Sequence, residues 1–321
     1  MGVRYVAGKM KILLVGATGA IGQPLLRRLM EHGHDVVATT RSAEKADLLR
    51  RIGVHVQFLD LLDRQAVAQA VGRSRPHVIL HQATALSGRP RLRNFDHWFA
   101  ATNALRTRGI DHLIEAATAH GVEAVVAQSF TGWNNARTGS AVKTEDDPLE
   151  AEPLPSQTRT LGAIRHLEHA VLAAHLRGIV LRYGAFYGPG ASESMIELVR
   201  RRMLPLIGNG EGVWSWIHVD DAAAATVAAI ERGDAGIYHV VDDEPAKVSE
   251  WLPTLADAIG AKPPLRIPAW AGRLLAGAAA ARWMTEGRGA SNAKAKRELR
   301  LQLKYPTWRE GFRHGVSRHL S

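Results

Sequence analysis

The feature that most constrains this chain is a regular alternation of short apolar segments with longer amphipathic ones. Six apolar segments, each of a length that suits a buried strand, are 11–17, 35–40, 55–60, 77–83, 124–130 and 178–184. Segments with helical periodicity separate them, and the longest is 99–121. Strand, helix and strand at this spacing predict right-handed crossovers between parallel strands. The predicted fold class is therefore α/β, a Rossmann-type doubly wound parallel sheet.

After residue 184 the alternation changes. We predict a large sheet domain from 10–184 plus 215–241, and a smaller, mostly helical lobe from 185–214 plus 242–321. Ligands of open parallel sheets bind at the carboxyl ends of the strands, so we expect the lobe there. The apolar segment 274–281 is too short to span a bilayer and is predicted to be a buried helix. Helix ends are predicted at the glycines 33, 53, 109 and 121.

The segment "VGATGAIG" follows the first predicted strand and opens the first predicted helix. Three glycines allow a sharp turn, a close approach to a pyrophosphate and tight packing of helix on strand, while the helix N-terminus offers free N–H groups. A glycine-rich turn without a ligand is the alternative. The context favours a dinucleotide site. The residues predicted to bind the dinucleotide here are Gly16, Thr18, Gly19, Ala20, Ile21 and Gly22.

The end of the second predicted strand distinguishes NAD from NADP. A carboxylate there would bind the ribose hydroxyl of NAD, whereas an arginine accommodates the 2′-phosphate of NADP. This strand ends with Arg41 and Ser42, and the first carboxylate is Glu44. We predict NADP rather than NAD, although Arg41 could also be a solvated loop residue. Asp60, with Leu61, is predicted to lie at the adenine or to cap the next helix.

Composition excludes several classes of protein. The chain has no cysteine, which excludes disulfides, thiolate catalysis and cysteine-ligated metals. Its 15 histidines form no recognisable ligand set, so no metal is predicted. The formal net charge is +10, but the arginines are dispersed and no DNA-binding motif occurs, so no nucleic-acid partner is predicted. We expect a cytoplasmic protein with a small-molecule substrate and no membrane partner.

Several motifs occur in a fixed order along residues 10–312: "GATGAIG", "DL" at 60–61, "HQATA", "TNALRTRGIDHLIEAA", "QSFTGW", "LRYGAFYGPG" and "WIHVDDAAAA". This ordered set resembles the extended short-chain dehydrogenase/reductases, the NAD-dependent epimerase/dehydratase family. The resemblance implies that Gln82 and Ala83 lie near the ribose and nicotinamide, with Asn103 and Ala185 also at the cofactor. It implies that Ser129 binds the reacting oxygen. Dimers through two long helices are what it implies for assembly.

The chain departs from this family where a Tyr-x-x-x-Lys pair is expected. In "TLGAIRHLE" the matching positions hold Thr160 and Ile164, and no tyrosine lies between Ser129 and Arg182. In the family the tyrosine is the general acid/base, its pKa lowered by the lysine. A threonine hydroxyl is too weak an acid for that role, so the family mechanism cannot run unchanged.

Other groups could compensate for the missing pair. The predicted catalytic set is Ser129, Thr160, Lys143 and Tyr183, of which Lys143 is otherwise a solvated loop lysine. Tyr183 and Tyr187 could donate a proton if the pKa of either were lowered, although packing is the simpler role for both. The predicted substrate contacts are Thr131, Trp133, Asn135 and Tyr187.

Three functions are compatible with these residues. The first is an atypical NAD(P)-dependent oxidoreductase that transfers hydride to or from a carbonyl or hydroxyl substrate by positioning. The second is an NAD(P)-dependent epimerase or dehydratase on a sugar-like substrate, against which the missing acid–base pair counts. The third is a non-catalytic NADP-binding sensor. The polar residues after the fifth predicted strand favour an enzyme.

Overall fold

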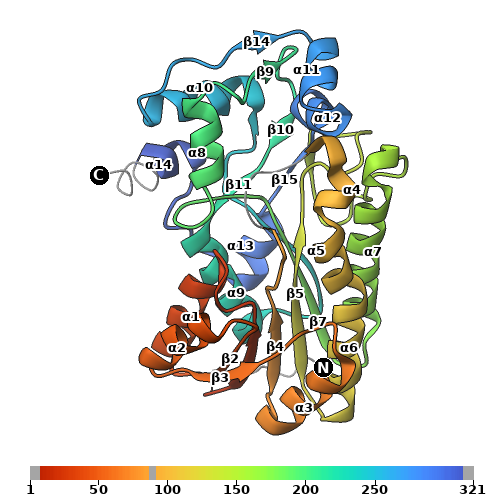
Figure 1. Cartoon of the computed structure of the whole chain (residues 1–321), viewed down its shortest axis with the longest axis vertical. Coiled ribbons are helices and arrows are strands. Elements are labelled where there is room, and N and C mark those ends of the chain that lie inside the picture. The colour runs from red at the N-terminus through yellow and green to blue at the C-terminus, as the bar shows by residue number, and fades with distance from the viewer. Residues whose placement is uncertain (1–7, 87–91, 314–321) are drawn as a thin grey trace.

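The computed structural model describes residues 8–86 and 92–313. Its centre is a seven-stranded parallel sheet with the order β12-β7-β5-β4-β1-β2-β3 (Figure 1). The strands are β1 (Lys11–Val15), β2 (Asp35–Thr40), β3 (His55–Phe58), β4 (Val78–His81), β5 (Ala124–Phe130), β7 (Arg177–Tyr183) and β12 (Gly236–Val240). The order reverses between β1 and β4, which makes their carboxyl ends the switch point where such sheets bind ligands. The predicted fold class is confirmed.

Helices cover both faces of this sheet. The helices α1 (Gly22–Glu31), α2 (Ala43–Arg51) and α9 (Val219–Arg232) pack on one face, with α13 (Ala293–Leu299) beside α9. The helices α3 (Arg64–Ser74), α6 (Ile110–Ala119) and α7 (Thr158–Ala173) pack on the other. Alternate residues of β1 therefore enter two separate cores, Ile12 and Leu14 on one side, Leu13 and Val15 on the other.

The helix predicted over 99–121 is continuous but irregular. It follows the short α4 (Phe95–Trp98) and consists of α5 (Ala100–Ala104), a π-helical turn (Leu105–Gly109) and α6. Gly109 has a φ of −63° inside this helix, so the prediction of a helix end there is wrong. Gly33, Gly53 and Gly121 have positive φ angles at helix ends, which confirms the other three predictions.

The smaller lobe lies over the carboxyl ends of the strands, at the top of Figure 1. It contains α8 (Glu193–Arg200), β9 (Leu206–Ile207), β10 (Val213–Trp214), β13 (Ala246–Lys247), α10 (Val248–Ala258), β14 (Arg266–Ile267), α11 (Ala269–Leu275), α12 (Ala278–Glu286) and α14 (Trp308–Gly311). Two short strands, β8 (Ala185–Tyr187) and β11 (Trp216–His218), pair below it. The hydrophobic core of the lobe includes Trp216, Trp251 and Trp308. The segment that carries α13 returns to the sheet, although our division places it in the lobe.

The prediction of one buried helix over 274–281 is wrong for its first half, while Ala279, Ala280 and Ala281 are buried in α12 as expected. Gly277, with a φ of 92°, separates α11 from α12, and a Cβ at this position would lie 2.8 Å from the Cα of Arg93. Leu274 and Leu275, at the end of α11, are exposed. No helix in residues 8–86 and 92–313 is long and apolar enough to cross a membrane.

Candidate active site

The turn between β1 and α1 is shaped by its glycines. Gly16 has a φ of +93°, and a Cβ there would lie 2.7 Å from the backbone nitrogen of Ala83. A Cβ on Gly22 would overlap the carbonyl oxygen of Gly16. The backbone nitrogen of Gly19 donates to that same oxygen at 3.1 Å, which closes the turn. Larger residues at 16 and 22 would therefore force this turn apart.

The N-terminus of α1 is open to a ligand. Its N-cap residue, Ile21, provides no side-chain hydrogen bond, and its first turn holds no acidic residue. Gly19 is exposed, while Thr18 and Ala20 are partly exposed beside it. Free N–H groups and the positive end of the helix dipole suit a phosphate group. These residues fit a dinucleotide pyrophosphate.

At the end of β2, Arg41 is exposed, and within the described part of the chain its guanidinium has no hydrogen-bond or ion-pair partner. The Ser42 hydroxyl accepts a hydrogen bond from the backbone nitrogen of Lys45 and caps α2. The carboxylate of Asp60 is exposed, and within residues 8–86 and 92–313 it accepts a single hydrogen bond, from the backbone nitrogen of Leu62 at 3.0 Å. Asp63, not Asp60, caps the next helix. Asp60 therefore keeps an oxygen for a ligand.

The loop after β4 joins the glycine turn to the interior. Ala83 packs against Gly16, and the side-chain nitrogen of Gln82 donates to the Tyr183 hydroxyl at 3.3 Å. The side-chain oxygen of Gln82 is buried and has no hydrogen-bond partner among residues 8–86 and 92–313. A buried acceptor of this kind favours a ligand donor nearby. Burial lowers the pKa of the preceding His81 to about 4, so this imidazole is neutral.

Ser129 belongs to a buried network of polar and charged side chains between α7 and the sheet. Its hydroxyl donates to Glu168 at 2.7 Å, and Arg182 binds the same carboxylate through two nitrogens at 2.8 and 2.6 Å. Arg106 lies close enough to interact electrostatically with Glu168, while burial lowers its pKa to about 10. The predicted contact of Ser129 with a reacting oxygen competes with this bond to Glu168.

Thr160 is fully buried at the start of α7. Its hydroxyl donates to the carboxylate of Asp96 at 2.6 Å and accepts from the side-chain nitrogen of Asn103 at 3.0 Å. The same carboxylate accepts from the backbone nitrogens of Arg159 and Thr160, at 3.0 and 2.8 Å. The predicted cofactor residue Asn103 thus binds Thr160, while its side-chain oxygen is buried and finds no partner in the part of the chain that the structure describes. No tyrosine or lysine occurs in α7.

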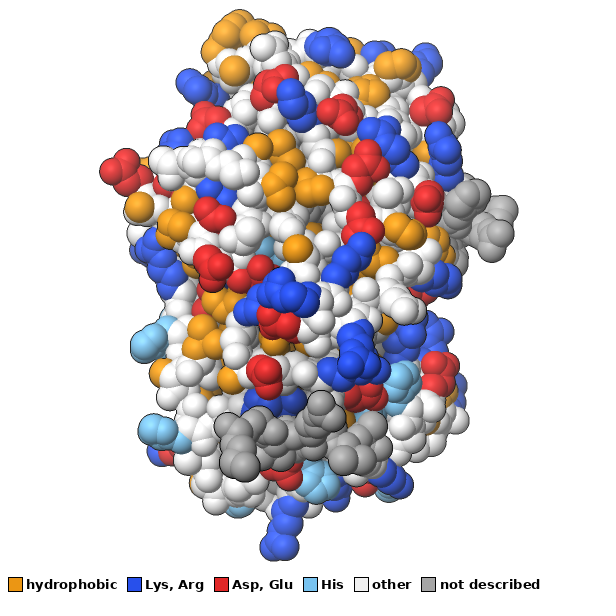
Figure 2. All heavy atoms as spheres, turned by 180° about the vertical axis from the view of Figure 1, so that it is seen from behind, with side chains coloured by type: hydrophobic (Ala, Val, Ile, Leu, Met, Phe, Trp, Pro, Cys, Tyr) orange, Lys and Arg blue, Asp and Glu red, His pale blue; other side chains and the backbone are white. Residues whose placement is uncertain are grey.

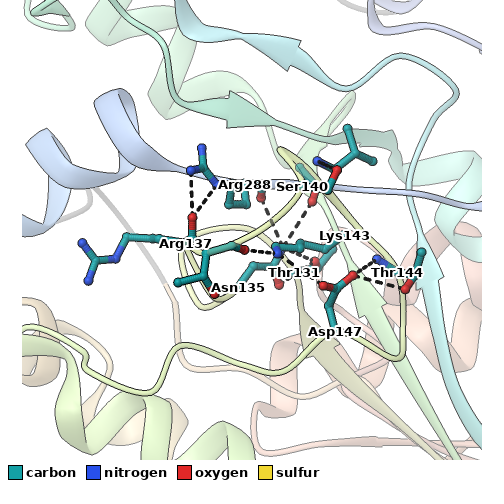
Figure 3. Close-up of polar contacts among 11 residues, drawn as sticks. Thr131, Asn135, Arg137, Ser140, Lys143, Thr144, Asp147 and Arg288 are labelled. Atoms are coloured by element: carbon teal, nitrogen blue, oxygen red, sulfur yellow. Dashed lines mark hydrogen bonds and ion pairs between the residues drawn. The ribbon is translucent and has the colours of Figure 1, made fainter.

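Lys143 does not face the cleft as predicted. It lies on the short strand β6 (Val142–Lys143), which pairs with β15 (Gly289–Ala290), and its side chain is 2% exposed. Its ammonium donates to the carbonyl of Thr138 and to Asp147 (Figure 3). A proton-transfer role for Lys143 is therefore not supported.

The predicted substrate residues Thr131 and Asn135 bind each other. The side-chain nitrogen of Asn135 donates to the Thr131 hydroxyl at 2.9 Å and to the carbonyl of Arg288 at 3.2 Å (Figure 3). They fix the loop after β5 to the segment before β15. Ala185 is partly exposed at the start of β8, and its nitrogen donates to the Ser215 carbonyl.

Neither Tyr183 nor Tyr187 has the lowered pKa that proton donation would require. Burial raises the pKa of Tyr183 to about 12, and its hydroxyl bonds to Thr226 at 2.6 Å. Tyr187 is fully buried in the core of the lobe, where burial also raises its pKa and its hydroxyl has no partner among the described residues. The role of Tyr183 as a proton donor and that of Tyr187 as a substrate contact are corrected, because both side chains are inaccessible.

Two features of the site escaped the sequence prediction. Asp96 lies 64 residues from Thr160 in sequence, and no local pattern connects them. An aromatic wall also lines this region: Trp133 and Phe99 both contact Phe95, with ring centroids 4.8 and 4.7 Å apart. Of these aromatic residues only Trp133 was predicted to face a ligand. Trp133 is partly exposed, as that role requires.

Comparisons with known proteins agree with this geometry. The family model described as the NAD dependent epimerase/dehydratase family matches residues 12–241. A 3-diazoavenalumate denitrifying reductase of a Streptomyces species is 42% identical over 310 residues, covering 94% of this chain and 99% of the relative.

Solved structures show the same fold. The UDP-glucose 4-epimerase of Thermotoga maritima has a TM-score of 0.74 at 21% identity, covering 97% of this chain and 100% of that one. The human epimerase family protein SDR39U1, solved with NADPH, also has a TM-score of 0.74 at 21% identity, covering 96% of this chain and 99% of that one. The chain belongs to the NAD dependent epimerase/dehydratase family and is an NAD(P)-dependent oxidoreductase or epimerase/dehydratase.

Proposed function

We propose that this enzyme is an NADPH-dependent reductase of a diazo compound, an electrophile whose reduction expels dinitrogen. The observation that carries the proposal is the position of Thr160, which the family resemblance aligns with the catalytic tyrosine. Its hydroxyl is buried and bonded to Asp96 and Asn103, so it does not exchange protons with a substrate. The identity with a denitrifying reductase extends over nearly the whole of both chains and supports the same reaction.

The chemistry of a diazo group explains why no tuned acid is needed. Bound NADPH supplies a hydride. The substrate gains that hydride and one proton from water, its carbon–nitrogen bond breaks, and N2 leaves with the bonding electrons. The loss of N2 drives the reaction forward, whereas reduction of a carbonyl develops an alkoxide that a general acid normally protonates. The protein's contribution is then to position the substrate and the hydride donor.

Aromatic side chains beside the loop that follows β5 suit an aromatic substrate. Phe95, Phe99 and Trp133 form one aromatic group, and Phe130 contacts Trp283 of the lobe with ring centroids 5.9 Å apart. Both groups adjoin the loop that follows β5. Aromatic rings bind flat conjugated molecules through offset or edge contacts.

The choice of NADP follows from Arg41. This exposed arginine ends β2, where a carboxylate would be expected for NAD. Removing it in Arg41→Ala should weaken NADPH binding about tenfold, equivalent to about 1.4 kcal/mol, and leave NADH binding unchanged. Titration of the reduced nicotinamide fluorescence measures both. An equal loss of affinity for NADPH and NADH would mean that Arg41 does not bind the 2′-phosphate.

The substrate is tested by supplying 3-diazoavenalumate and benzaldehyde in parallel with NADPH. We expect oxidation of NADPH and formation of the denitrified product from the diazo compound, and no turnover of the aldehyde. Thr160→Val should keep kcat within about threefold once the protein is folded, because the hydroxyl is not a proton donor. Turnover of the aldehyde, abolished by Thr160→Val with binding of NADPH intact, would instead establish a carbonyl reductase.

A further inference from the structure

The far end of the lobe exposes large apolar side chains. On α11, Trp270, Leu274 and Leu275 are 69%, 64% and 65% exposed. Met203 and Leu265 are also exposed, at 55% and 45%. The pairing of β9 with β14 brings the chain segments that carry these two residues to the same end of the lobe. An apolar group of this size at one end of a molecule normally marks a contact surface.

The packing of α11 explains why this face points outward. Gly272 lies against the side chain of Ile207 on β9, so closely that a Cβ would overlap it. The glycine side of α11 is therefore pressed onto the lobe. Trp270 and Leu274 are four residues apart and share one face of the helix, which stays uncovered in the folded chain.

Every charged side chain in the segment between Asp257 and Glu286 is basic. From residue 258 to residue 285 the chain has no Asp or Glu but has Lys262, Arg266, Arg273 and Arg282. The first three of these are exposed. Arg200, Arg201 and Arg202 directly precede Met203, and Arg201 pairs with Glu197. Figure 2 shows hydrophobic and Lys/Arg side chains at the top of the molecule, the end that carries α11 in Figure 1, with some Asp and Glu side chains close by.

We propose that this end of the lobe, formed by α11 and the segments around Met203 and Leu265, docks on an anionic lipid surface. Tryptophan and leucine side chains insert at the boundary between headgroups and acyl chains, while lysine and arginine bind the anionic headgroups. Each basic residue near such a surface adds to the electrostatic attraction. The docking is peripheral, and it replaces our sequence-based expectation of no membrane partner.

Charge also argues against a second copy of this chain as the occupant. A two-fold interface places the same patch of each copy against the other. Here that arrangement would bring Arg266, Arg273 and Lys262 of both copies together, with no carboxylate in 258–285 to pair with them. An anionic surface neutralises all of them at once.

The test is co-sedimentation of the full chain with vesicles. Vesicles of phosphatidylcholine with phosphatidylglycerol should bind the protein, vesicles of phosphatidylcholine alone should bind it at least tenfold less, and added salt should release it. The double variant Trp270→Ser with Leu274→Ser should lose about tenfold or more in vesicle affinity. The matched control is Leu48→Ser with Ile52→Ser, because these exposed residues lie on and just after α2 in the sheet domain, away from the lobe.

Binding of NADPH reports that both double variants are folded. Three results would overturn the proposal: no binding of the unaltered protein to anionic vesicles, equal binding by both double variants, or equal binding to neutral vesicles. Light scattering that shows a dimer dissociated by the Trp270 and Leu274 changes, without vesicle binding, would assign this end of the lobe to self-association instead.

Discussion

Two helices begin at the same edge of the sheet, and their N-termini are satisfied in opposite ways. At α1, no side chain in the described part of the chain caps the helix, and no carboxylate lies in the first turn. At α7, the carboxylate of Asp96 accepts hydrogen bonds from the backbone nitrogens of Arg159 and Thr160. The positive end of α1 is therefore available to an anion, whereas that of α7 already holds one.

This difference separates the cofactor half of the site from the half that carries acid–base chemistry in the family. Around α1 the glycine turn is accessible at Gly19, and the buried side-chain oxygen of Gln82 has no partner among the described residues. Along α7 the polar side chains of Thr160 and Glu168 are bonded within the protein. The α1 side has the shape that a dinucleotide pyrophosphate requires, while the polar groups of α7 named here bind other residues of the protein. Such a protein can position a hydride donor without supplying a tuned acid.

The largest expected effect comes from Glu168, which joins α7 to the sheet. Glu168→Ala removes the carboxylate that Arg182 binds through two nitrogens and that Arg106 faces, and breaking a buried ion pair in this way costs about 3–5 kcal/mol of unfolding free energy. Urea unfolding measures it. The control is Glu115→Ala, which removes an exposed ion pair with Arg64 and should change little. Equal effects of the two changes would mean that Glu168 is not a structural element of the α7 side.

The next effect concerns the α1 side. Gly22→Ala places a methyl group on the Gly16 carbonyl and opens the turn, so we expect affinity for NADPH to fall about 100-fold. Gly162→Ala is the matched control, because nothing lies within 4 Å of a Cβ at that position on α7. Alanine there should raise the unfolding free energy by up to about 1 kcal/mol. Unchanged NADPH affinity in the Gly22 variant would remove the turn from the cofactor site.

The two sides also differ in how far the sequence predicts them. The glycine turn and the strands around it follow local patterns, because periodicity and turn glycines act over a few residues. The sequence shows that α7 lacks tyrosine and lysine, but not what Thr160 binds. Its partner Asp96 comes from a separate helix, and the partners of Ser129 come from α7 and β7. Contacts of this kind depend on tertiary packing alone.

The remaining wrong predictions concern side chains whose burial or exposure the sequence did not indicate. Lys143 lies in a polar loop, a pattern typical of a solvated side chain, yet the pairing of β6 with β15 covers it. The apolar segment 274–281 suggested a buried helix, but the left-handed conformation of Gly277 divides it and leaves Leu274 and Leu275 exposed. In both cases residues distant in sequence decide what a side chain contacts.

The smallest expected effect tests whether Asp96 is only a cap. Asp96→Ala removes the acceptor for two backbone nitrogens of α7 and should cost about 1–2 kcal/mol of unfolding free energy. Asparagine also caps helices well, so Asp96→Asn should cost only a few tenths of a kcal/mol. If α7 is structural, the Asn variant keeps its turnover number and its pH profile. If instead Asp96→Asn is stable but loses turnover, with the pH dependence of kcat altered, Asp96 exchanges protons through Thr160. In that case α1 would bind the cofactor and α7 would carry the acid–base group, so the two helices would differ in catalytic role and not only in whether their N-termini are capped.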